Sequence, residues 1–101
     1  MPSENGIPIL LFFTASTSGP ARRMESLLAH LARKERGRLR IARIDIAQSP
    51  EWAERLRVEE VPTLVLIKGR RPVGRLEGRA SAPQIARMVA PHLAPREKQA
   101  A

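Results

Sequence analysis

Four side-chain hydroxyls stand close together in the segment Thr14-Ala15-Ser16-Thr17-Ser18. A serine hydroxyl becomes a nucleophile when a neighbouring base removes its proton, and no histidine lies in or beside this segment. We therefore expect Ser18 or Thr17 to cap the start of a helix by accepting bonds from backbone N–H groups. The alternative is an anion site, because hydroxyls and a helix N-terminus together can bind phosphate.

Cysteine and histidine chemistry is almost missing from the chain. None of the 101 residues is cysteine, which excludes disulfides, thiolate metal sites and a catalytic thiol. His30 and His92 are the only histidines. Two histidines and no cysteine are few ligands for a metal site and few side chains for a histidine-based triad. We therefore predict that the protein holds no metal or cofactor and is not an enzyme.

The hydroxyl segment lies between a predicted strand and a predicted helix. Residues 7–13 are all apolar, as expected for a strand that is buried on both faces. Pro20 suits the first turn of a helix, and Gly37 would end that helix. One apolar stripe at helical spacing runs along it, formed by Met24, Leu27, Leu28 and Leu31.

Further elements follow along the chain. The alternation in residues 39–46 predicts a second strand. Ser49-Pro50 predicts the N-cap and first residue of a short helix to about residue 56, with Trp52 or Ala53 and Leu56 facing inward. Residues 64–67 and 73–76 predict two strands joined by a turn at residues 69–71. Ser81 and Gln84 fit the capping box of a last helix, which Pro91 disturbs near its end.

This order of elements is β-α-β, a short helix, and then β-β-α. A β-α-β unit joins two parallel strands by a right-handed crossover, and the hairpin adds an antiparallel pair. We predict an α/β fold with a four-stranded mixed sheet flanked by helices, in one domain over residues 7–93. Residues 1–6 are expected to be a disordered start and residues 94–101 a disordered tail.

Two short motifs carry a resemblance to a known family. Ser18-Gly19-Pro20-Ala21 resembles the C-G-P-C redox motif of thioredoxins, with Ser18 and Ala21 in place of the two cysteines. Val61-Pro62-Thr63 is similar to the I-P-T tripeptide whose proline is cis in that family, and Gly78 matches the glycine that lines its substrate groove. The resemblance covers roughly residues 7–93 and implies a minimal thioredoxin-like fold, without the first strand and helix of a full thioredoxin.

The resemblance also shows what has been lost. The buried aspartate that assists proton transfer in thioredoxins falls at Phe12 here, and the active-site tryptophan falls at Thr17. With no cysteine, the degenerate motif implies a redox-inactive module, with cis-Pro62 beside the Ser18 loop. The groove expected to bind an extended protein segment or partner protein comprises Thr17, Ser18, Val61, Pro62, Gly78 and Arg79.

Two other hypotheses stay open at this point. The chain could be an oxidoreductase whose cysteines were replaced, which the genomic codons for residues 18 and 21 would reveal. It could instead bind anions or nucleic acid through arginines, since its net charge is +8 and residues 22–43 carry eight basic groups against two acidic ones. No nucleic-acid motif accompanies this charge, so we expect solvated arginines, with Arg43 reaching solvent or Asp45.

The apolar run at residues 7–13 also bears on where the protein resides. It is far shorter than the roughly 20 residues that span a membrane. It also lacks the positive flank of a signal peptide, because Glu4 and no lysine or arginine precedes it. We therefore expect a cytoplasmic monomer with no membrane partner.

Overall fold

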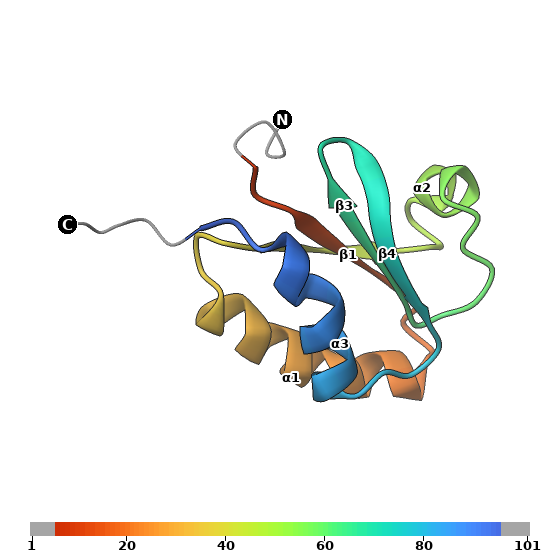
Figure 1. Cartoon of the computed structure of the whole chain (residues 1–101). Coiled ribbons are helices and arrows are strands. Elements are labelled where there is room, and N and C mark those ends of the chain that lie inside the picture. The colour runs from red at the N-terminus through yellow and green to blue at the C-terminus, as the bar shows by residue number, and fades with distance from the viewer. Residues whose placement is uncertain (1–5, 96–101) are drawn as a thin grey trace.

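A computed structural model describes residues 6–95 of the chain (Figure 1). Its elements follow the predicted order, with a 3₁₀ turn after the last helix. They are β1 (Ile9–Thr14), α1 (Gly19–Lys34), β2 (Arg40–Asp45), α2 (Pro50–Arg55), β3 (Thr63–Lys68), β4 (Arg71–Glu77), α3 (Ala82–Val89) and η2 (Ala90–His92). The predicted α/β fold is therefore confirmed.

The four strands form one mixed sheet in the order β2-β1-β3-β4. β1 pairs in parallel with β2 and antiparallel with β3, and β3 pairs antiparallel with β4. Gly69 and Arg70, both with positive φ, form the two-residue turn between β3 and β4, as tight hairpins require. Pro72 lies in edge strand β4, where its missing N–H is tolerated.

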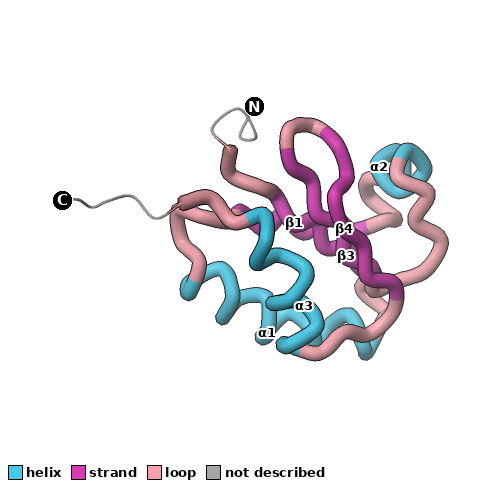
Figure 2. The backbone as a smooth tube through the Cα atoms, in the orientation of Figure 1, coloured by secondary structure: helices cyan, strands magenta, loops and turns pink. Residues whose placement is uncertain are grey.

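The two faces of the sheet are covered unequally (Figure 2). α1 and α3 pack on the face that presents Leu10 and Phe12, and we call this the α1/α3 face. The opposite face presents Leu11 and Phe13 and is covered by the six-residue helix α2, so we call it the α2 face. Because β1 lies between β2 and β3, its side chains are buried on both faces, which explains its continuous apolar run.

The helix starts follow the predicted capping chemistry at two of three positions. The Ser18 Oγ accepts the Ala21 N–H at 3.1 Å and so caps α1. Ser81 and Gln84 complete a reciprocal capping box at the start of α3. Ser49 occupies the N-cap position of α2 but makes no side-chain bond there, because its backbone lies outside the extended region that the other two caps adopt.

Two predicted side-chain placements left alternatives open, and the structure distinguishes between them. Ala53 is the buried residue of α2, whereas Trp52 is 43% exposed and lies against the Arg55 guanidinium, 5.2 Å from the ring centroid. Arg43 reaches solvent and an acid as expected, and the acid is Glu25 of α1, at 3.0 Å, and not Asp45. The Asp45 carboxylate accepts the backbone N–H of Ala47.

The ordered domain extends beyond the predicted boundary at residue 93. Ala94 is buried, and its backbone N–H donates to the Arg38 carbonyl at 3.1 Å. In return, the Arg38 Nε donates to the Ala94 carbonyl at 2.8 Å. Ala94 is therefore part of the domain and not of a disordered tail, whereas residues 1–5 and 96–101 of the predicted disordered ends lie outside the described residues.

Candidate functional site

The strand register brings three segments of the predicted groove to one end of the sheet. Phe13 near the end of β1 pairs with Thr63 at the start of β3, and Thr63 pairs with Glu77 at the end of β4. The loop to Ser18, the turn at Pro62 and the turn at Gly78 therefore all leave the sheet at this end, where α1 begins (Figure 1).

The turn before β3 and the turn after β4 are joined directly. The Gly78 N–H donates to the Pro62 carbonyl at 2.8 Å, and the Val61–Pro62 peptide bond is cis. Pro62 is buried whereas Val61 is half-buried. Within residues 6–95, neither the N–H nor the C=O of Val61 has a hydrogen-bond partner.

Gly78 has a backbone conformation that favours glycine. Its φ is +81°, and a Cβ built at this position would meet no atom within 4 Å. The absence of a side chain therefore leaves open space beside the Pro62 carbonyl. Arg79 follows it and is exposed.

Ser18 is committed to structure and is not activated. Its Oγ accepts the Ala21 N–H and its carbonyl accepts the Arg22 N–H at 3.1 Å. Its own N–H donates to the Ala15 carbonyl at 3.0 Å. Pro20 has no N–H, so the first turn of α1 keeps few free donors for an anion. This arrangement favours the capping role over both a nucleophile and a phosphate site.

The hydroxyl segment does not act as one cluster. Ser16 and Thr17 are exposed, whereas Thr14 is fully buried as the last residue of β1. The Thr14 Oγ1 has no hydrogen-bond partner among the described residues. The sequence places these hydroxyls side by side, but strand and loop geometry separate them.

The positions that carry thiol chemistry in the resemblance hold inert side chains here. Ser18 is the N-cap and Ala21 is buried beneath the first turn of α1. Phe12, at the position of the assisting aspartate, lies in the core of the α1/α3 face at 2% exposure. No thiol is available in the chain to attack a disulfide.

Acidic residues that sequence reasoning did not assign to the site lie at the same end of the sheet. Glu59, Glu60 and Glu77 line a surface hollow of about 270 Å³ with Arg57. The Thr63 hydroxyl donates to the Glu60 carbonyl at 2.8 Å, which fixes the chain just before Val61. The excess of acidic residues between Asp45 and Glu60 was a visible signal, but only the register of β3 and β4 adds Glu77 to it.

Metal-ligand clusters and membrane-spanning helices are both missing from the described part of the chain. Within residues 6–95, no three side chains of histidine, cysteine, aspartate or glutamate come together as metal ligands. No helix in the same range has the length and apolar character needed to cross a bilayer.

Comparison with known proteins gives a consistent result. The family model described as thioredoxin matches residues 3–91. A thioredoxin from Alicyclobacillus acidocaldarius is 34% identical over 71 residues, which are 70% of this chain and 68% of the relative. A bifunctional thioredoxin reductase/thioredoxin from Mycobacterium leprae is also 34% identical over 71 residues, but this chain spans only 16% of its length.

A solved structure extends the likeness to three dimensions. The germline-specific thioredoxin Deadhead from Drosophila melanogaster matches with a TM-score of 0.81 and 30% identity, over 89% of this chain and 84% of that one. The α/β architecture described above agrees with this match. The chain therefore belongs to the thioredoxin family, as a member in which Ser18 and Ala21 stand where the family motif has cysteines.

Proposed function

We propose that this protein is a redox-inactive member of its family that binds an extended segment of a partner protein. The proposed groove comprises Thr17, Ser18, Val61, Pro62, Gly78 and Arg79. The observation that carries the proposal is the unpaired backbone of half-buried Val61, next to the bond between Gly78 and Pro62. An extended peptide can pair with such a backbone as an added strand.

The energetics favour a short, shape-dependent contact. Each backbone hydrogen bond to Val61 contributes about 0.5–1.5 kcal/mol net, so side-chain contacts in the groove must supply the rest. The open space at Gly78 allows a peptide to approach the Pro62 turn closely. Glu77 at the same end already pairs with Arg75, so the Glu60 carboxylate would favour a segment with a basic residue beside the paired one.

Redox inactivity is the chemical half of the proposal. Disulfide exchange needs a thiolate to attack and a second thiol to resolve the mixed disulfide. The Ser18 hydroxyl is far less acidic than a thiol and is already bonded to the Ala21 N–H. The protein would therefore bind without turning over a disulfide.

The test is affinity capture from the source cell's lysate with a matched pair of variants. Gly78→Asn adds a side chain in the groove, and asparagine tolerates positive φ better than most residues. Gly37→Asn is the control, because Gly37 has a φ of +83° and equally open surroundings but lies beyond the other end of α1.

We expect Gly78→Asn to reduce recovery of the partner at least tenfold, and Gly37→Asn to leave it within twofold. Equal recovery by both variants would contradict the groove, as would wild-type chain that captures nothing. Circular dichroism must first show that both variants keep the wild-type fold.

We also propose that the protein is a cytoplasmic monomer. Most of the apolar run at residues 7–13 forms the buried central strand β1. This burial supports a structural role for the run and not the role of a signal peptide. Cell fractionation and light scattering of the purified chain test these two statements.

A cysteine-replaced oxidoreductase remains the second candidate. The Ser18 Oγ and Ala21 N–H lie 3.1 Å apart on one helical turn, so a scaffold for two cysteines persists. Genomic codons for cysteine at residues 18 and 21 would favour it. Efficient insulin reduction by a Ser18→Cys, Ala21→Cys double variant would show that the scaffold still supports turnover, and the wild-type chain should show none.

A further inference from the structure

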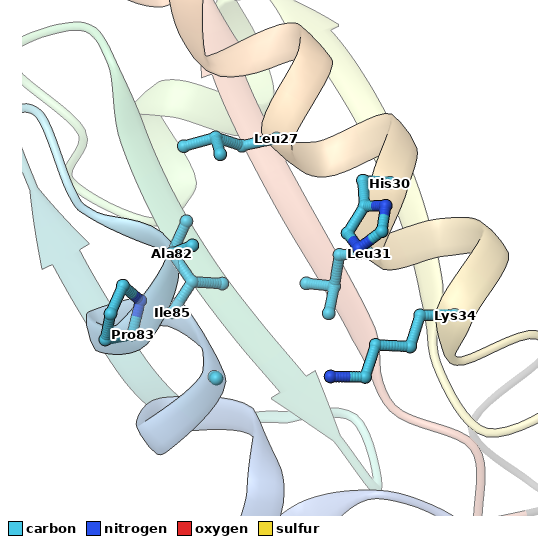
Figure 3. Close-up of a pocket in the computed structure, with 8 residues that line it drawn as sticks. Leu27, His30, Leu31, Lys34, Ala82, Pro83 and Ile85 are labelled. Atoms are coloured by element: carbon cyan, nitrogen blue, oxygen red, sulfur yellow. The ribbon is translucent and has the colours of Figure 1, made fainter.

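A second surface of the molecule combines an apolar floor with a basic rim. α1 and α3 diverge on the outside of the α1/α3 face and leave a cleft of about 270 Å³ between them (Figure 3). Leu27 and Leu31 project into it from α1, and Ala82, Pro83 and Ile85 line it from α3. This cleft is separate from the groove at the end of the sheet.

The floor of the cleft is incompletely covered. Leu27 belongs to the apolar stripe of α1, and such a stripe is normally buried, yet this side chain is 38% exposed. α3 has only eight residues, and its small side chains Ala82 and Ala86 do not fill the space opposite Leu27. An apolar side chain from another molecule would fit here and remove Leu27 from water.

Among residues 6–95, the one charged residue that lines the cleft is a lysine. Lys34 lines the cleft and extends from α1 toward α3 across one end of it (Figure 3). Arg87 follows the lining residue Ala86 on α3. α3 carries no acidic residue. The single carboxylate of α1, Glu25, is occupied by Arg43. No carboxylate of either helix therefore offsets this basic rim.

We propose that the cleft between α1 and α3 docks an acidic amphipathic helical segment of a partner protein. Apolar residues spaced by three or four positions enter the cleft, and flanking aspartates or glutamates meet Lys34 and Arg87. A second copy of this chain does not suit the site, because each copy carries a net charge of +8. The apolar side chains of the floor likewise offer no hydrogen-bond donors to the phosphates of a nucleic acid.

The test lets the chain select its own ligand. A phage-displayed library of random 16-residue peptides is first depleted on a chain carrying Leu27→Gln and Lys34→Glu, and is then panned on the wild-type chain. Arg33→Glu serves as the matched control, because it makes the same charge change one residue from Lys34, at a position that does not line the cleft. Affinities of the selected peptides are measured by fluorescence anisotropy.

We expect selected peptides in which aspartate or glutamate flanks apolar residues at spacings of three or four. Their dissociation constants should rise at least tenfold with Lys34→Glu or Leu27→Gln and less than threefold with Arg33→Glu. Equal losses with Lys34→Glu and Arg33→Glu would overturn the proposal, because the attraction would then come from overall charge. Failure to recover any peptide after depletion would overturn it too.

Two further arms distinguish the cleft from the groove and a peptide from a lipid or nucleic-acid ligand. Gly78→Asn should leave the affinity of the selected peptides unchanged. The proposal for the cleft and the proposal for the groove are therefore tested separately. Anionic vesicles of phosphatidylcholine and phosphatidylserine, and a 20-nucleotide oligo-dT, are tested against the same variants. If their binding depends on Leu27 and Lys34 more strongly than that of the peptides, the proposed occupant is wrong.

Discussion

The two faces of the sheet show how differently one small domain can bury its apolar residues. On the α1/α3 face, two helices enclose Leu10, Phe12 and the inward residues of β3. On the α2 face, a helix of six residues covers Phe13 and Val65 but leaves Trp52 exposed. Burial and cavity formation determine the cost of a substitution, so the α1/α3 face should hold most of the free energy of unfolding.

The largest effect is expected at Phe12. Phe12→Ala removes a side chain that is 2% exposed and should lower the free energy of unfolding by about 3–5 kcal/mol. Trp52→Ala on the α2 face should lower it by less than Phe12→Ala does, because the Trp52 side chain is already 43% exposed and its removal leaves no closed cavity. Urea denaturation of both variants measures the contrast, and comparable losses would mean that the two faces are equally important.

An intermediate effect is expected at Gly74 of β4. A Cβ there would lie 2.8 Å from the Cγ and 2.9 Å from the Sδ of Met88, which packs against the α1/α3 core. Gly74→Ala should therefore destabilise the protein by about 1–3 kcal/mol through overpacking. Truncating Met88 to alanine removes both of the atoms that the added Cβ would approach.

A double-mutant cycle isolates this contact. Gly74→Ala should cost at least about 0.5 kcal/mol less in a Met88→Ala background than in the wild type, which is the usual lower range of coupling between residues in contact. An additive result would show that the extra methyl group does not clash with Met88.

The smallest effect compares the start of α1 with the start of α2. Ser18→Ala removes the bond to the Ala21 N–H and should cost about 1 kcal/mol. Ser49→Ala removes no side-chain cap and should stay within about 0.5 kcal/mol of the wild type. Thermal unfolding by circular dichroism distinguishes the two, and an equal loss would show that the Ser18 cap contributes nothing specific.

The parts of the fold that sequence reasoning recovered depend on local patterns. The apolar run of β1, the Ser18 cap and the Ser81–Gln84 box each follow from residues within a few positions of one another. The match of two spaced motifs to a known family then indicated the overall fold. The end of the sheet that carries the groove follows from this topology, while binding in the groove stays a prediction.

The parts that sequence reasoning missed depend on contacts between distant residues or on element length. Arg43 pairs with Glu25, eighteen positions away, so neither residue signals the other by spacing. In the six-residue helix α2, Ala53 is buried and Trp52 is exposed. The sequence pattern of so short a helix does not show which of the two faces the sheet. Ala94 joins the domain through Arg38, which is fifty-six positions earlier.

The mutual bonds of Arg38 and Ala94 also fix where the last described residues lie on the domain. Arg38 follows the far end of α1, a helix of 16 residues that is about 24 Å long at 1.5 Å per residue, whereas Ser18 caps the near end. A chain end bearing an affinity handle or fluorophore is therefore joined to the domain beside the end of α1, whereas the groove lies where α1 begins (Figure 1). Immobilisation through that handle would keep the point of attachment away from the groove.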